Sequence, residues 1–102
     1  MILVYGIPNC DKVKKCLLDL KANQTPHQFI NFKLHPPTED LLKLWAQAFG
    51  ELPVNKRGTT FKKFKESYEK ANKFKKMELL IENPSMLIRL ILMKKAQVLS
   101  IG

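Results

Sequence analysis

The chain of 102 residues has only two cysteines, two histidines and no apolar run near the ~20 residues of a membrane span. We therefore expect no membrane contact. The apolar run Met1–Tyr5 is too short for a signal peptide and has no basic leader. His27 and His35 lack the spacing of metal ligands, so we expect both to be ordinary loop residues and no metal to be bound.

The two cysteines lie in one predicted helix and are not expected to pair. Six helical residues separate the Cα atoms of Cys10 and Cys16 by roughly 10 Å, too far for a disulfide. Cys16 would lie beside Val13 and Leu20, so we interpret it as a small core residue rather than as a resolving thiol. Two unpaired thiols are typical of a reducing compartment, which predicts a cytoplasmic protein.

Acidic residues are scarce. Nine of them oppose eighteen basic residues, and the formal net charge is +9. The excess is greatest over residues 56–76, with nine basic and two acidic residues. Such a charge favours phosphates, nucleic acid or acidic protein surfaces as partners. A solvated helical face explains the run as well, because Phe61, Phe64 and Tyr68 recur at core spacing within it.

The segment before Cys10 reads as a strand that leads into a helix. The pattern predicts a strand over Met1–Tyr5, a turn at Gly6–Pro8 and a helix over about residues 10–22 with Asn9 as its cap. Cys10 would then be the first helical residue, where free N–H groups and the helix dipole stabilise a thiolate. The placement favours a reactive thiol over an ordinary apolar cysteine. Three lysines of the first two turns would add positive charge: Lys12, Lys14 and Lys15.

The remaining pattern alternates between strands and helices. It predicts a strand at 28–32, a helix from the Thr38 cap to Gly50, helices at about 61–68 and up to Pro84, and a hairpin of strands 90–93 and 97–100. The expected buried residues are Val13, Leu17 and Leu20 on the first helix, and Leu41, Leu42, Trp45, Ala48 and Phe49 on the second. This order predicts an α/β fold with a four-stranded mixed sheet.

Three blocks of sequence carry a family resemblance. They are Tyr5–Lys15 (YGIPNCDKVKK), Asn55–Thr60 (NKRGTT) and Asn83–Arg89 (NPSMLIR). In this order they resemble the ArsC family in its YffB/Spx-like branch, over nearly the whole chain. The resemblance implies one thioredoxin-like domain over residues 1–102, with a helical insertion at about 38–84 between its β-α-β and β-β parts.

The resemblance also implies a site. In this family the cysteine at the first helix is the nucleophile, and arginines around it hold an oxyanion. Cys10 would thus attack arsenic or a disulfide sulfur, while Arg57 and Arg89 bind arsenate or a carboxylate of glutathione. Asn9 would complete the anion pocket, and Lys14 would favour the thiolate. Without the family, both arginines read as ordinary surface residues.

Three positions depart from the family pattern. Leu90 stands where the family has a proline that is cis in thioredoxin-like folds, so we expect a trans bond and an altered pocket wall. Gly102 ends the sequence about where arsenate reductases have a third arginine, which argues against efficient arsenate reduction. Val13 replaces the second cysteine of the Spx-type C-x-x-C switch, which argues against a dithiol sensor.

These features together predict a monothiol, glutathione-dependent thiol/disulfide oxidoreductase related to arsenate reductases, with Cys10 as nucleophile. Glutathione or glutaredoxin would be its partner, with glutathione as co-substrate and no bound cofactor. The alternative is a non-catalytic, Spx-like regulator whose basic helical region binds RNA polymerase or another acidic protein. We expect a monomer in either case.

Overall fold

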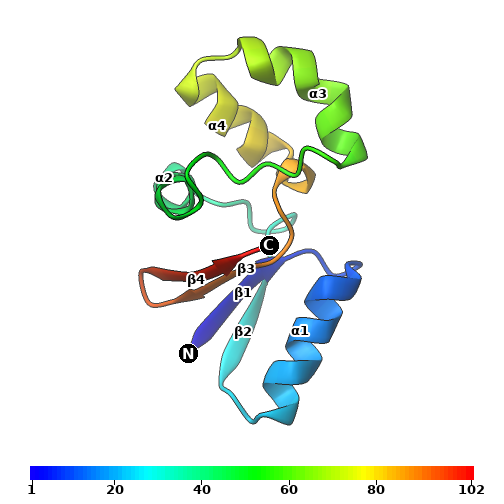
Figure 1. Cartoon of the computed structure of the whole chain (residues 1–102), viewed down its shortest axis with the longest axis vertical. Coiled ribbons are helices and arrows are strands. Elements are labelled where there is room, and N and C mark those ends of the chain that lie inside the picture. Colours follow the sequence, from blue (N-terminus) through cyan, green and yellow to red (C-terminus); the bar gives the residue numbers. More distant parts are fainter. The chain divides into compact units, whose positions relative to one another are not determined.

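The computed structural model describes all residues 1–102, and the chain divides into two compact units. The first unit joins Met1–His35 to Ile88–Gly102, and the second is Pro36–Leu87. The second unit contains the segment 38–84, for which the sequence predicts a helical insertion. Figure 1 shows the sheet and the first helix of the first unit, and the helices of the second. No helix is long and apolar enough to cross a membrane.

A four-stranded sheet forms the centre of the first unit. Its order is β2-β1-β3-β4, so β1 and β3 are the inner strands. β1 is parallel to β2 and antiparallel to β3, and β3 is antiparallel to β4. The predicted mixed sheet and α/β fold class are therefore confirmed. The strands are β1 (Ile2–Gly6), β2 (His27–Asn31), β3 (Ile91–Lys94) and β4 (Gln97–Ile101).

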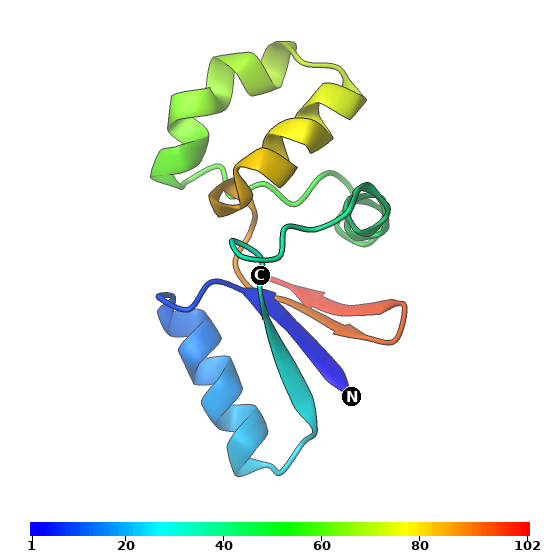
Figure 2. The same ribbon diagram turned by 180° about the vertical axis from the view of Figure 1, so that it is seen from behind.

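Helix α1 (Asp11–Ala22) connects β1 to β2 and lies along the sheet, as both views of the ribbon show (Figures 1 and 2). Val13 is its one fully buried residue. The predicted buried stripe is too wide, because Leu17 and Leu20 are only half-buried. A helix that packs on a small sheet buries a narrow line of side chains, and residues beside that line stay partly in solvent.

The second unit is helical. It contains α2 (Glu39–Phe49), α3 (Thr59–Lys70), α4 (Lys73–Glu82) and a 3₁₀ turn at Pro84–Met86. Leu42 and Trp45 of α2 are fully buried, as predicted, whereas Leu41 is only half-buried. Ala48 and Phe49 were expected on the same apolar face, but both are exposed because they lie in the last turn of the helix. The other buried side chains of this core include Phe61, Tyr68, Met77, Leu80, Met86 and Leu87.

Side-chain caps set the helix ends in the second unit. The Thr38 hydroxyl accepts a hydrogen bond from the backbone N–H of Leu41 at 3.2 Å, which confirms the predicted N-cap of α2. Gly50 ends α2 with φ +96°, a conformation that glycine adopts without a steric penalty. The Asn72 side chain caps α4 in the same way, accepting from the Lys75 N–H at 2.9 Å.

Candidate functional site

Cys10 lies in the loop that joins the inner strand β1 to helix α1. Ile7, the first residue after β1, is buried and anchors the loop, while Pro8 and Asn9 form an exposed turn. Cys10 itself is half-buried. The chain therefore turns in solvent and brings the thiol back to the start of the helix.

Cys10, and not Asn9, is the N-cap of α1. Its backbone is extended (φ −118°, ψ 124°), and its carbonyl oxygen accepts the first helical hydrogen bond, from the Lys14 N–H at 3.0 Å. The expectation that Asn9 caps the helix and Cys10 is its first residue is thus wrong by one position. Asn9 belongs to the preceding turn, and the helix starts where Val13 can reach the sheet.

The thiol of Cys10 makes no capping hydrogen bond. The first N–H groups of any α-helix have no acceptor within the helix, so they present donors and positive potential at this end. The Cys10 sulfur at the cap position lies beside these donors but forms no hydrogen bond with them. This arrangement is chemically suited to a thiolate nucleophile or to an anion bound next to one.

Two other predicted site residues flank Cys10 in sequence. Asn9 is exposed in the turn and does not cap the helix. Lys14 is exposed one turn into α1, and its ammonium group forms no ion pair. Both side chains are therefore available to a ligand at the start of α1.

Arg89 belongs to the same unit as Cys10, two residues before β3. Its side chain is half-buried, and its Nε atom is fully buried without a hydrogen-bond partner. A buried donor of this kind is costly to leave unpaired, by about 1–3 kcal/mol or more for a charged group. The enclosed Nε distinguishes Arg89 from an ordinary, fully solvated surface arginine.

Arg57 belongs to the second unit and lies in a tight loop before α3. The Asn55 side chain holds this loop, accepting from the Arg57 N–H at 3.3 Å, while the Asn55 carbonyl accepts from the Gly58 N–H at 3.1 Å. The Asn55 N–H donates to the Met86 carbonyl at 2.7 Å, which ties the loop to the 3₁₀ turn. The loop backbone is fixed in this way, while the Arg57 side chain is exposed.

Leu90 has a backbone conformation that its sequence does not reveal. Its peptide bond is trans, as predicted, but its φ is +114°, which is rare for a bulky residue. The Leu90 carbonyl accepts a hydrogen bond from the Gly102 N–H at 3.0 Å. Pairing at the start of β3 thus holds a strained residue next to Arg89, at a typical cost of ~1–3 kcal/mol.

Cys16 is not the core residue that the spacing predicts. It is half-buried and lines a shallow pocket of about 340 Å³, together with Leu90 and Gly102. Burial first, and then the carboxylate of Asp19, raise the pKa of its thiol. Both effects disfavour the thiolate, so Cys16 is a poorer nucleophile at neutral pH than an ordinary cysteine.

His35 lies in a loop, as expected, but His27 does not, because it is the first residue of β2 and pairs with Ile2 of β1. The ring Nδ1 of His27 donates to the Thr25 carbonyl at 2.8 Å, and the backbone N–H of His35 donates to the Asn31 carbonyl at 2.9 Å. No group of three or more His, Cys, Asp or Glu side chains lies close enough together to hold a metal ion.

Comparison with known proteins places the chain in a family. The sequence profile of the ArsC family matches residues 5–102. An uncharacterized protein of Haemophilus influenzae is 33% identical over 101 residues, which span 97% of this chain and 89% of that protein.

Solved structures show the same thioredoxin-like fold. A YffB protein superposes with a TM-score of 0.81 at 27% identity, over 100% of this chain and 91% of the other. An arsenate reductase (ArsC) related protein of Brucella melitensis superposes with a TM-score of 0.72 at 26% identity, over 99% of this chain and 85% of the other. The chain described here belongs to the ArsC family.

Proposed function

We propose that this protein is a monothiol thiol/disulfide oxidoreductase that uses glutathione as co-substrate and Cys10 as nucleophile. Membership of the ArsC family and the arsenate-reductase-like fold support the oxidoreductase class. The observation that carries the assignment to Cys10 is its place at the N-cap of α1, half-buried and with a thiol that makes no capping bond.

A single thiol must carry the reaction in this proposal. Both cysteines are free, and the first five residues of α1 separate them. Val13, where a C-x-x-C motif would have its second cysteine, is fully buried against the sheet. The second thiol must therefore come from a co-substrate, and glutathione supplies it.

The proposed reaction has two thiol exchanges. The Cys10 thiolate attacks the glutathione sulfur of a mixed disulfide, a bond forms between Cys10 and glutathione, and the substrate leaves as a thiolate that takes up a proton. A second glutathione, as its thiolate, then attacks the glutathione sulfur of the adduct. Glutathione disulfide leaves, the Cys10 thiolate is restored, and the substrate has gained two electrons.

Arg89 is the anion-binding group that we propose for this site. Its side chain is half-buried, and the terminal N–H groups of its guanidinium would donate to a carboxylate of glutathione, while the Nε atom itself is enclosed by the protein. Lys14 and the N–H groups at the start of α1 would add further positive potential. A role for Arg57, in the second unit, and for Asn9 rests on the family resemblance alone.

The test is steady-state reduction of a glutathionylated peptide, coupled to glutathione reductase. We expect activity in the wild type and in Cys16→Ser, and none in Cys10→Ser. Arg89→Gln should raise the KM by about tenfold or more, because a charged hydrogen bond is lost. Equal activity of Cys10→Ser and the wild type would refute the proposal.

An inactive but folded wild-type protein would also refute it. That result would favour the alternative of a non-catalytic protein that binds an acidic partner such as RNA polymerase. The circular dichroism melting curve of each variant serves as the control for folding.

A further inference from the structure

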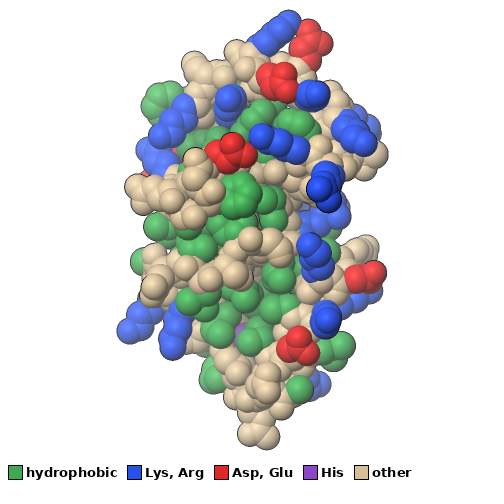
Figure 3. All heavy atoms as spheres, viewed as in Figure 1, with side chains coloured by type: hydrophobic (Ala, Val, Ile, Leu, Met, Phe, Trp, Pro, Cys, Tyr) green, Lys and Arg blue, Asp and Glu red, His purple; other side chains and the backbone are tan.

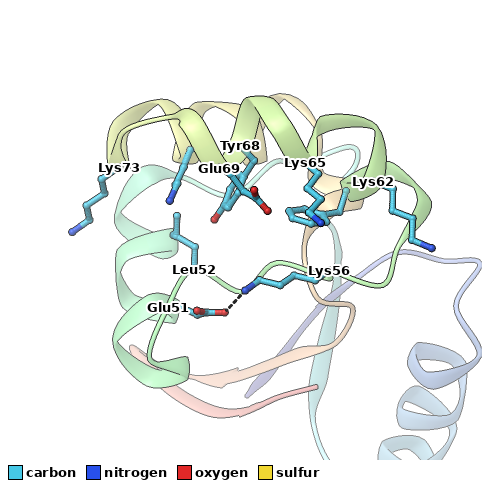
Figure 4. Close-up of a pocket in the computed structure, with 10 residues that line it drawn as sticks. Glu51, Leu52, Lys56, Lys62, Lys65, Tyr68, Glu69 and Lys73 are labelled. Atoms are coloured by element: carbon cyan, nitrogen blue, oxygen red, sulfur yellow. Dashed lines mark ion pairs between the residues drawn. The ribbon is translucent and has the colours of Figure 1, made fainter.

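A second candidate binding site lies in the helical unit, among the segment 51–56 and helices α3 and α4. It is a cavity of about 690 Å³, in the size range of small-molecule sites. Figure 4 shows Tyr68 and Glu69 of α3 pointing toward the segment that carries Leu52 and Lys56, while Lys62 and Lys73 lie at opposite ends of the cavity. All of its lining residues belong to the second unit, and none is used by the proposed reaction.

The floor of the cavity is apolar. Leu52 is half-buried, while Phe61 and Tyr68 are only 4% and 8% exposed. The two rings meet edge to face, with centroids 5.7 Å apart. Burial first, and then the Glu51 carboxylate, raise the pKa of Tyr68, so its hydroxyl stays protonated and can donate a hydrogen bond. The floor thus accommodates an apolar body and offers one polar contact.

The rim of the cavity has more lysines than glutamates, so it carries a net positive charge. Five lysines and two glutamates line it: Lys56, Lys62, Lys65, Lys73, Lys76, Glu51 and Glu69. Lys56 pairs with Glu51 at 3.3 Å, and the Lys76 ammonium lies 5.1 Å from the centre of the Tyr68 ring.

Three rim lysines remain without an ion pair, Lys62, Lys65 and Lys73. Elsewhere on the same helices, Lys70 and Lys75 are paired with glutamates. Figure 3 shows Lys and Arg side chains around the apolar atoms over α3 and α4. The uncompensated charge at the rim therefore favours a ligand with several negative charges.

We propose that this cavity binds a nucleoside diphosphate or triphosphate. Its phosphates would contact the free ammonium groups of Lys62 and Lys65, which lie three residues apart on α3, since lysine binds phosphate as a point charge. The nucleoside would lie on the apolar floor. Glu69 has no partner of its own and would accept a hydrogen bond from an amino group of the base.

Two other ligand types fit the cavity less well. Single-stranded nucleic acid follows an extended basic groove with successive bases on several aromatic faces, whereas this site is a single cavity of about 690 Å³, the size of a small-molecule site. A bare polyphosphate would leave the apolar floor and Glu69 unused. A small anion with an apolar, hydrogen-bonding body uses all three features of the cavity.

The test is calorimetric titration of the full chain with adenosine triphosphate and adenosine diphosphate. Tripolyphosphate, adenosine and an oligothymidylate are titrated in parallel. We expect saturable binding of both nucleotides to one site, and weaker binding of the other three probes. Lys62→Gln and Lys65→Gln should each weaken nucleotide binding about threefold to tenfold, the effect of losing one contact to a charged group.

Lys63→Gln is the matched control, because Lys63 is exposed on the same helix but does not line the cavity. It should leave nucleotide affinity unchanged, as should Cys10→Ser. Absence of saturable nucleotide binding at millimolar concentration would overturn the proposal. So would equal weakening by Lys63→Gln and Lys65→Gln, or binding of tripolyphosphate or the oligonucleotide as tight as that of the nucleotides.

Discussion

A Cβ atom on Gly6 would lie 2.7 Å from Cγ2 of Val13. Val13 is fully buried, and Gly6 is the last residue of the inner strand β1. The missing side chain of Gly6 therefore lets α1 approach the end of β1 closely. This contact fixes the first turn of the helix, and with it the position of Cys10.

Gly6→Ala should destabilise the protein by ~1–3 kcal/mol, since the added methyl overpacks a stiff, β-branched neighbour. Urea denaturation measures the loss. In the double variant Gly6→Ala/Val13→Ala the smaller Val13 side chain makes room, so the two effects should be non-additive by ~0.5–3 kcal/mol. If the effects of the two substitutions on the free energy of unfolding were strictly additive, the Val13 side chain would not be what excludes a methyl group at Gly6.

Leu90→Pro should destabilise the fold by more than ~1 kcal/mol, although the family resemblance implies a proline at this position. Proline fixes φ near −65°, whereas Leu90 has φ +114°. The midpoint of chemical denaturation checks this expectation. Leu90→Gly is the control, because glycine adopts the observed φ without strain and should cost less than proline. A proline variant as stable as the wild type would contradict the observed backbone.

Thr38→Ala should cost ~1 kcal/mol of stability, because the Thr38 hydroxyl caps α2. Asn9→Ala should stay within ~0.5 kcal/mol of the wild type, because Asn9 is exposed and caps no helix. Thermal unfolding of the two variants, side by side, measures the difference. A larger loss for Asn9→Ala would restore Asn9 as the cap of α1.

Alkylation of Cys16 should require a higher pH than alkylation of an ordinary cysteine. Burial and the Asp19 carboxylate raise the pKa of its thiol, so at a given pH less thiolate is present than in a free cysteine. In the Cys10→Ser background, the pH at which the alkylation rate of Cys16 is half-maximal should lie above the pKa of an ordinary thiol. Asp19→Asn should lower this pH. Asp11→Asn is the control, because it removes a carboxylate from the first turn of the same helix that does not contribute to the shift at Cys16. A midpoint that Asp19→Asn leaves in place would rule out this origin of the shift.

Much of the fold could be predicted because it depends on local patterns. The Thr38 cap and the Gly50 stop are properties of single residues, and the strands follow from runs of apolar, β-branched side chains. The extent of burial depends on the partner surface instead. Spacing places Leu17 and Cys16 correctly on α1, but it does not tell how far the sheet extends over them.

The sequence names candidate residues for the site, but it does not predict their geometry. Asn9 and Cys10 can both end a turn before a helix, and the packing of α1 on the sheet selects Cys10. The positive φ of Leu90 has no local signal, because strand pairing around β3 imposes it. The unpaired Nε of Arg89 likewise arises from burial, which one sequence does not specify.

The most direct test of the account is intact-mass and peptide mapping after brief exposure to glutathione disulfide at neutral pH. Wild type, Cys10→Ser and Cys16→Ser are compared. The account predicts one glutathione adduct, on Cys10, that added reduced glutathione removes, and no adduct in Cys10→Ser. An adduct on Cys16 alone, or equal modification of the two thiols, would contradict Cys10 as the nucleophile.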